Sequence, residues 1–243
     1  MTPFLYGKHP AFGDFISYGG DGALISGLDR WLERVLPPIK AELGPAWAQA
    51  WSSAPPLRFW LGAEVLGRPA QGLFLASRDR VGRAYPLIVG LTDVAFVPPT
   101  DPRHSEAPYD ALWNHILRNA PPSATKFGGA AELLDGFDPV AGAAFEWSDG
   151  QESTVWGHRT DGDLPRLFAD ARGVDAARAQ YRRSHWWHPA TGPRAAGWMG
   201  ADGLPDTAAM KWLLTERWMP VVADAPEVAV EIVAPETDED PSA

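Results

Sequence analysis

Three charged or titratable side chains near the start of the chain are candidates for acid–base chemistry. Lys8, His9 and Asp14 fall close together, among glycines and a proline that fix the course of the backbone. A catalytic role would require a concave site in which their pKa values are displaced. We favour the competing interpretation, in which Asp14 caps a turn or pairs with an arginine while Lys8 is solvated. No Gly-x-Ser-x-Gly elbow is present, so a hydrolase of that type lacks its nucleophile signal.

A second charged motif, residues 78–87, reads Arg-Asp-Arg-Val-Gly-Arg-Ala-Tyr-Pro-Leu. Three guanidinium groups within six residues could bind a phosphate or a partner's carboxylate in bidentate fashion. They could equally pair inside the molecule with Asp14, Asp79 or the acids of a helix that carries Asp29 and Glu33. Both interpretations stay open, and an internal pair between an arginine and Asp14 would join the two motifs into one structural feature.

Nucleotide and metal signatures are weak in this chain. Gly7-Lys8 resembles the end of a phosphate-binding loop, but Thr2 stands where the loop needs glycine and His9 where it needs a hydroxyl residue. The pair His185 and His188 falls in a segment with strand character, where residues three apart point to opposite faces. We therefore expect no cofactor and no metal. A phosphate- or nucleotide-sensing domain built on the arginines remains the alternative function.

Composition predicts a folded domain followed by an acidic tail. The chain has 243 residues, of which 45% are hydrophobic and twelve are tryptophan, enough for a full core. Seven acids and no Lys or Arg occur from Asp224 onward, so residues 1–223 carry only about −3 of the formal net charge of −10. We expect a single domain over 1–223 and a flexible tail over 224–243, with no affinity for nucleic acid or anionic membranes.

The absence of cysteine excludes disulfides, thiolate metal sites and cysteine nucleophiles. The first residues show no secretory signal, and no apolar run approaches the roughly 18 residues of a membrane span. These features predict a cytoplasmic protein.

Hydrophobic periodicity predicts an α/β (α+β) sandwich with a mainly antiparallel sheet. Apolar residues at helical spacing predict a helix over 28–39, capped by Ser26 and Asp29, which the Pro37-Pro38 pair should kink or end before a second helix. Strands are expected at 57–61, 73–77 and 85–91, as an antiparallel meander. Further expectations are a helix over 109–117, short strands at 143–147 and 153–156, a hairpin of 186–187 with 195–199, and a closing helix over 207–218.

Taken together, these segments resemble the TagF family, also called ImpM, of type VI secretion system-associated proteins. The matching segments are 7–15, 29–32, 54–59, 79–87, 184–187 and 203–205, and the resemblance extends over roughly residues 4–218. Each motif is modest alone, but their order and spacing are specific. The chain departs from the family pattern at His185, where a more apolar residue is common, and in its acidic tail.

The resemblance implies a longin- or profilin-like fold, with helices on both sides of the sheet. It implies a cytoplasmic accessory protein, not an enzyme, that restrains type VI secretion after translation. Its partner would be the forkhead-associated scaffold of that system or a membrane-complex subunit. Because strand faces alternate, one of the two neighbouring tryptophans is expected to pack inside, so that at most the other could be free for binding. The candidate partner-binding or family-motif residues are Lys8, Gly13, Asp14, Phe15, Arg80, Gly82, Arg83, Tyr85, Ser184, Trp186 and Trp187.

Overall fold

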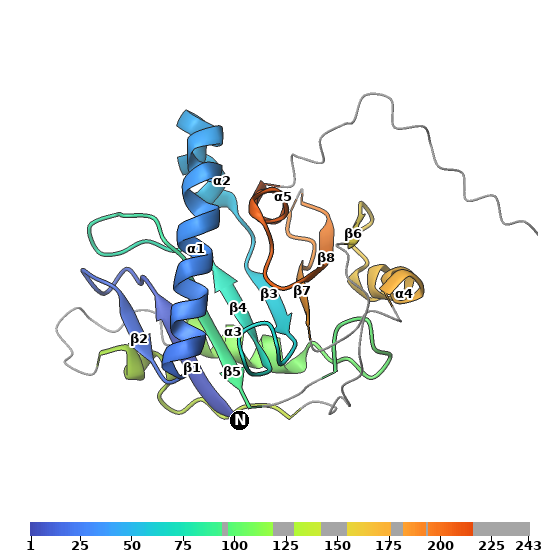
Figure 1. The fold of residues 1–243 in the computed structure, drawn as a ribbon, viewed down its shortest axis with the longest axis horizontal. Coiled ribbons are helices and arrows are strands. Elements are labelled where there is room, and N and C mark those ends of the chain that lie inside the picture. The colour runs from blue at the N-terminus through green and yellow to red at the C-terminus, as the bar shows by residue number, and fades with distance from the viewer. Residues whose placement is uncertain (94–96, 119–128, 142–154, 176–181, 193, 216–243) are drawn as a thin grey trace, which may run out of the picture.

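The computed structural model describes residues 1–93, 97–118, 129–141, 155–175, 182–192 and 194–215. These form one eight-stranded sheet in the order β2-β1-β5-β4-β3-β7-β8-β6, in which every neighbouring pair is antiparallel (Figure 1). The strands are β1 (Thr2–Gly7), β2 (Ile16–Tyr18), β3 (Leu57–Leu61), β4 (Ala70–Leu75), β5 (Leu87–Thr92), β6 (Val155–Arg159), β7 (Arg183–His188) and β8 (Ala196–Asp202). The α+β class is confirmed, as are the meander β3-β4-β5 and the hairpin β7-β8.

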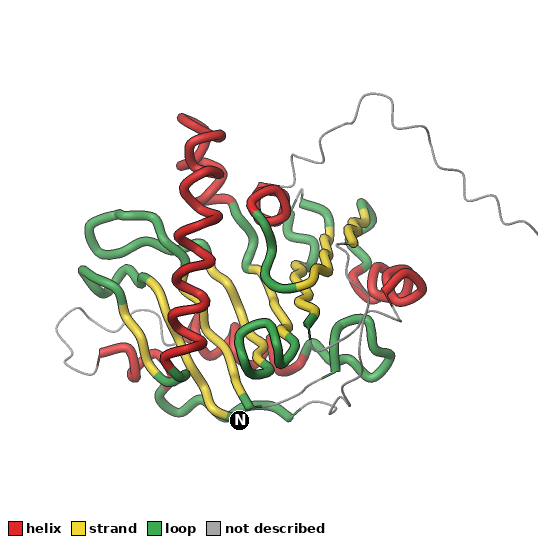
Figure 2. The backbone as a smooth tube through the Cα atoms, viewed as in Figure 1, coloured by secondary structure: helices red, strands yellow, loops and turns green. Residues whose placement is uncertain are grey.

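Helices cover both faces of this sheet. The α-helices are α1 (Gly22–Leu43), α2 (Trp47–Ser53), α3 (Ala107–Arg118), α4 (Leu164–Asp175) and α5 (Thr207–Thr215), with short 3₁₀ turns at Gly44–Ala46 and Gly129–Leu134. One apolar core lies between the sheet and α1, α2 and α5, and the second lies between the sheet and α3 and α4. Figure 2 shows the long helix α1 crossing the strands. The sheet is therefore the shared middle layer of a sandwich.

The first helix is longer than its sequence predicts. It begins at Gly22, where the Asp21 side chain accepts the N–H of Leu24 at 2.8 Å, so the expected cap at Ser26 and Asp29 is wrong. It also continues through Pro37 and Pro38, which lie exposed on its outer side. The apolar stripe runs on past the prolines on the buried face, so packing against the sheet outweighs the missing backbone hydrogen bonds.

Several expectations fall wholly or partly outside the described residues. These are the strand at 143–147, the first half of that at 153–156, the end of the closing helix beyond Thr215, and the acidic tail 224–243; residues 155–156 begin β6 as expected. Among the described residues, no helix is long and apolar enough to cross a membrane.

Candidate functional site

The first two motifs meet in the folded chain through a buried ion pair. Lys8 directly follows β1, and Asp79 lies after β4 in the turn 78–84, which we call the arginine turn and which a bridge between Arg78 and Ala84 closes. The Lys8 Nζ lies 3.0 Å from the Asp79 Oδ2, and the two residues are only 6% and 3% exposed. The expectation that Lys8 is solvated is therefore wrong, because Asp79 compensates its buried charge.

Asp79 also holds the arginine turn in shape. Its Oδ1 accepts the backbone N–H groups of Val81 and Arg83 at 3.1 and 2.8 Å, and its Oδ2 accepts the Nε of Arg83 at 2.5 Å. Burial alone would raise the pKa of this carboxyl. Hydrogen bonds from the Arg83 N–H, the Lys8 ammonium and the Arg83 guanidinium outweigh burial and hold the pKa of Asp79 well below its ordinary value.

The loop 9–15 is joined to this turn through backbone carbonyls. The N–H of Arg80 donates to the Phe12 carbonyl at 2.8 Å, and Nη2 of Arg83 donates to the Gly13 carbonyl at 2.8 Å. The expected pair between an arginine and Asp14 is not formed among the described residues. The Asp14 carboxylate is exposed and accepts the N–H of Phe15 at 2.9 Å instead. The two motifs therefore do form one structural feature, but by other contacts than the sequence suggested.

Glycine is needed at one position in this feature. Gly82, at the tip of the arginine turn, has φ of +89°, in the region that glycine adopts without strain. A Cβ on Gly13 would lie 3.1 Å from the Arg80 Nη2, at the far end of a flexible side chain, so the Arg80 guanidinium lies close to the Gly13 backbone but does not require glycine there. Local geometry thus explains Gly82 and not Gly13 of the predicted set.

Phe15 lies over a cluster of two tyrosines and an aspartate. Its ring stacks on Tyr6 at 6.1 Å and meets Tyr85 edge-on at 4.8 Å, and the Lys8 ammonium lies 4.8 Å from its centroid. The hydroxyls of Tyr6 and Tyr85 both donate to Oδ1 of Asp29 on α1, that of Tyr85 at 3.1 Å. Burial, followed by the hydrogen bond to Asp29, raises the pKa of Tyr6 to about 12. Burial likewise raises the pKa of Tyr85 well above its ordinary value.

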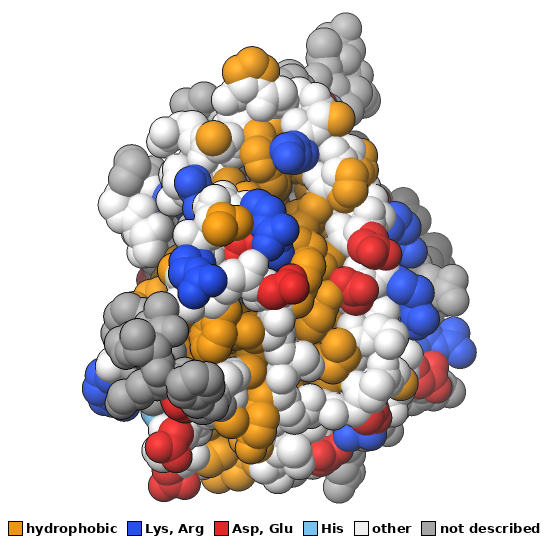
Figure 3. Space-filling view, turned by 90° about the vertical axis from the view of Figure 1, so that its left-hand side faces the viewer, with side chains coloured by type: hydrophobic (Ala, Val, Ile, Leu, Met, Phe, Trp, Pro, Cys, Tyr) orange, Lys and Arg blue, Asp and Glu red, His pale blue; other side chains and the backbone are white. Residues whose placement is uncertain are grey.

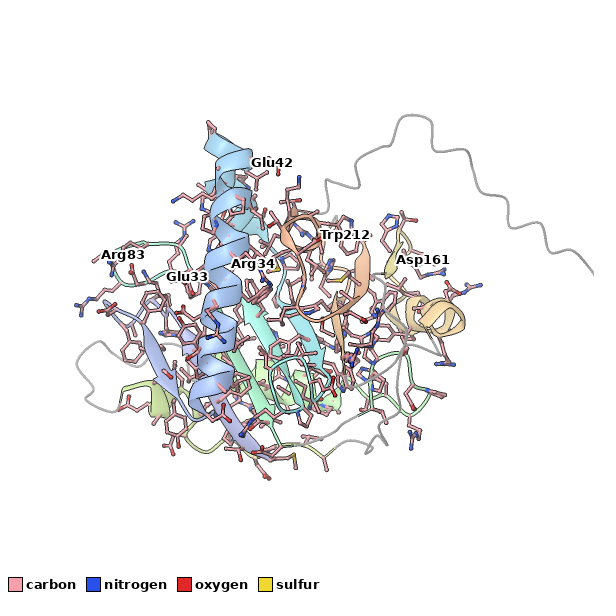
Figure 4. All side chains as sticks on the ribbon, in the orientation of Figure 1. Glu33, Arg34, Glu42, Arg83, Asp161 and Trp212 are labelled. Atoms are coloured by element: carbon pink, nitrogen blue, oxygen red, sulfur yellow. The ribbon has the colours of Figure 1, made fainter. Side chains whose placement is uncertain are left out.

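The outer side of this assembly exposes four side chains, which we call the recognition face: Phe15, Arg80, Val81 and Arg83. Phe15 is 47% exposed and Val81 69%. The guanidinium of Arg80 makes no hydrogen bond or ion pair within the described part of the chain. Figure 3 looks at this side of the molecule, where basic side chains gather beside a strip of hydrophobic ones. Figure 4 places Arg83 at the outer edge, across α1 from Trp212.

The third motif lies elsewhere and is part of the core. Trp186 and Trp187 occupy β7 in the middle of the sheet, and both are fully buried. The Trp186 indole donates to the Ser184 Oγ at 3.1 Å, and that hydroxyl donates to the Gly203 carbonyl at 2.5 Å. Neither tryptophan is free for binding, because helices cover both faces of the sheet. Ser184, Trp186 and Trp187 therefore do not belong to the recognition face.

The proposed acid–base trio does not converge. Lys8 is engaged by Asp79, and Asp14 points to solvent. Nδ1 of His9 accepts the N–H of Ala11 at 3.2 Å, and burial lowers the pKa of this imidazole. Among the described residues there is no cluster of His, Asp and Glu suited to hold a metal ion.

Sequence reasoning missed a second polar cluster, on the opposite face of the sheet. Glu106, just before α3, forms an ion pair with Arg58 and lies 2.8 Å from the Nε2 of His104. It also accepts the Trp187 indole N–H at 3.2 Å. The only hint in the sequence is Arg58, a charge inside the otherwise apolar strand β3. A partner 48 residues away cannot be read from spacing alone.

A family model and a solved structure are similar to this chain. A family model described as the TagF N-terminal domain, type VI secretion system-associated, matches residues 5–126, about half of the chain. The match contains α1, the loop 9–15 and the arginine turn. The solved structures include the crystal structure of PA0076 from Pseudomonas aeruginosa PAO1, which is 24% identical. The two align with a TM-score of 0.64 over 89% of this chain and 95% of that one. That identity supports a shared fold alone.

No curated protein matches this chain. The family model covers the segment in which the two charged motifs join, and the whole-chain fold agrees with a solved structure. The chain therefore belongs to the TagF family of type VI secretion system-associated proteins.

Proposed function

We propose that this chain is a non-enzymatic regulator of type VI secretion that works by binding another component of the system through the recognition face. By occupying that component, it would lower assembly of the secretion machine after translation. The partner we propose is the forkhead-associated scaffold, with a membrane-complex subunit as the other candidate. The basis for this partner is the family resemblance, and the basis for the surface is its geometry.

One observation carries the proposal: an exposed guanidinium without a partner in the described structure belongs to the same rigid assembly as two exposed apolar side chains. Arg80 precedes Val81 in the arginine turn, and its guanidinium lies close to Gly13, in the loop that also carries Phe15. Arginine and aromatic side chains are enriched among the residues that dominate binding energy at interfaces. The buried pair of Lys8 and Asp79 fixes the support, so little conformational entropy is lost on binding.

The same geometry separates the roles of the two arginines. The Arg83 side chain forms an ion pair with Asp79 and donates a hydrogen bond to the Gly13 carbonyl. A charge reversal at Arg83 would therefore place two carboxylates together and disrupt the arginine turn. Arg80 contributes only its backbone N–H to the fold and is the cleaner probe of binding. The alternative, phosphate or nucleotide sensing, predicts a thermal upshift with some nucleotide, and no shift across a nucleotide panel would remove it.

The test is a binding titration of the full chain against the purified forkhead-associated scaffold of the same organism. We expect Arg80→Glu to weaken binding at least about tenfold, as an interface hot spot does, while the melting temperature stays within about 2 °C.

Arg34→Glu is the matched control. Arg34 is exposed on α1 and makes no ion pair within the described residues, so its reversal changes the net charge equally (Figure 4). Equal loss of binding in both variants would mean a general charge effect and would contradict the proposed surface. Full binding by Arg80→Glu would contradict it as well.

A further inference from the structure

A mainly apolar pocket opens at the ends of β4 and α3, and none of the four side chains of the recognition face lines it. Its volume is about 330 Å³, and its lining includes His9, Ala54, Pro56, Trp113 and Leu117. Leu117 is 52% exposed, although it is apolar. A pocket of this size accepts one or two aliphatic side chains, and an apolar side chain that enters it removes this surface from water.

Two arginines are sequence neighbours of the residues that line the pocket. Arg118 follows the lining residue Leu117 at the end of α3, and Arg78 follows the lining residue Ser77. Both are exposed, and neither guanidinium makes a hydrogen bond or ion pair with the residues that the structure describes. The pocket therefore suits a segment that combines aliphatic side chains with carboxylates.

One segment of this chain has that chemistry. Residues 227–233 read Glu-Val-Ala-Val-Glu-Ile-Val and belong to the stretch with seven acids and no Lys or Arg. Val228, Val230 and Ile232 each have a glutamate as a direct sequence neighbour, Glu227 or Glu231. The rest of the chain, with a charge of only about −3, has no comparable excess of acids.

The connection to this segment starts close to the pocket. Nη1 of Arg194 donates to the Leu214 carbonyl at the end of α5, and Nη2 of the same guanidinium donates to the Ser53 carbonyl, both at 3.2 Å. Ser53 precedes the lining residue Ala54. Glu227 comes twelve residues after Thr215, a length that spans up to about 40 Å when extended. The segment can thus reach the pocket without strain on the fold.

We propose that the acidic segment 224–243 docks on its own domain, with an aliphatic side chain of 227–233 in this pocket and its carboxylates beside Arg78 and Arg118. A tethered segment has an effective concentration on the order of millimolar, so even a weak contact is populated. Docking covers Arg78, at the base of the arginine turn. This inference concerns a contact within the chain and does not depend on the identity of any partner.

The absence of cysteine allows a direct test in the full chain. Leu117→Cys with Val230→Cys places one thiol at the mouth of the pocket and one in the segment. Gln49→Cys with Val230→Cys is the matched control, because Gln49 is exposed on α2, which packs against α5. We expect the first pair to form an intramolecular disulfide at least about tenfold faster under mild oxidation. Equal rates would overturn the proposal, as would a disulfide that forms only between two chains.

Reversing charges in the segment 227–233 distinguishes specific docking from random collision of the two thiols. Glu227→Lys with Glu231→Lys, added to the first cysteine pair, leaves the tether length unchanged. We expect the disulfide to form severalfold more slowly, and 0.5 M salt to slow the original pair in the same direction. If neither the charge reversal nor the added salt changed the rate of disulfide formation, the carboxylates would not contact the arginines. Far-UV circular dichroism of each variant checks that the domain remains folded.

Discussion

At the scale of single residues, charged groups that look available for chemistry in the sequence support the backbone instead. Lys8 and Asp79 neutralise each other below the surface, and Arg83 ties their turn to the loop 9–15. Asp29 accepts from two tyrosines rather than from an arginine. Only Arg80 among the arginines of the recognition face is left to contact another molecule.

The depressed pKa of Asp79 makes a prediction about acid stability. The ordinary value is 3.8, and the value in the folded chain is lower, so the stabilisation is complete above about pH 4. It is lost as the pH falls from there toward the folded-state pKa. We expect Asp79→Asn to lower the melting temperature at pH 7 by about 5–10 °C, because Lys8 is left buried and unpaired.

The same substitution should make the melting temperature depend less on pH under acidic conditions. Between pH 4 and pH 2 the melting temperature of the variant should fall less steeply than that of the original chain, as followed by circular dichroism. Parallel curves for the two proteins would mean that Asp79 does not contribute to acid unfolding and would contradict its assigned role.

At the scale of elements, the sheet depends on close packing between strands, which the strand preferences of single residues do not predict. Gly90 on β5 pairs with Phe4 of β1 and Gly72 of β4. A Cβ on Gly90 would come 2.4 Å from the backbone carbonyl oxygen of Gln71 on β4 and 2.7 and 2.9 Å from the Phe4 ring. The missing side chain therefore lets the β4 backbone and a core aromatic ring both approach β5 closely, on the side of the sheet that α1 covers.

We predict that Gly90→Ala destabilises the protein by about 2 kcal/mol, as overpacking of a well-filled core does. Gly22→Ala, at the start of α1, has open space around the new methyl group and should change stability by less than about 0.5 kcal/mol. Urea denaturation of both variants measures the difference. Equal stabilities would mean that the Phe4 ring and the β4 backbone at Gln71 make room for the methyl group without cost.

At the scale of the whole molecule, two cores share a single sheet. Trp186 faces the core under α1, and its neighbour Trp187 faces the core under α3 and α4. The sheet continues without interruption from β2 to β6. We therefore propose that residues 1–223 form one cooperative domain, since each core packs on the sheet and neither can persist when the sheet unfolds.

This proposal predicts one unfolding transition. Tryptophan fluorescence and far-UV circular dichroism should give the same urea midpoint, because most of the largest buried side chains are aromatic and spread over both cores. Two separated transitions, or midpoints that differ between the probes, would show that the two halves unfold independently.

Sequence alone determined what depends on local pattern and on covalent chemistry. Alternating and helical periodicities located the meander, the hairpin β7-β8 and most helices, and the absence of cysteine removed whole classes of site. The order of the short motifs indicated the family. These inferences succeed because each depends on neighbours along the chain.

Tertiary structure decided which charges are used and which aromatic rings are buried. Asp79 contacts Lys8, which is 71 residues away in the sequence, and no periodicity in the sequence predicts that contact. Pro37 and Pro38 do not end α1, because packing of the helix on the sheet outweighs the local preference of proline to end a helix. Both tryptophans of β7 are buried because each face of the sheet is covered by its own helices. Such outcomes depend on which elements lie side by side, and a sum of pairwise energies over the whole fold fixes that arrangement.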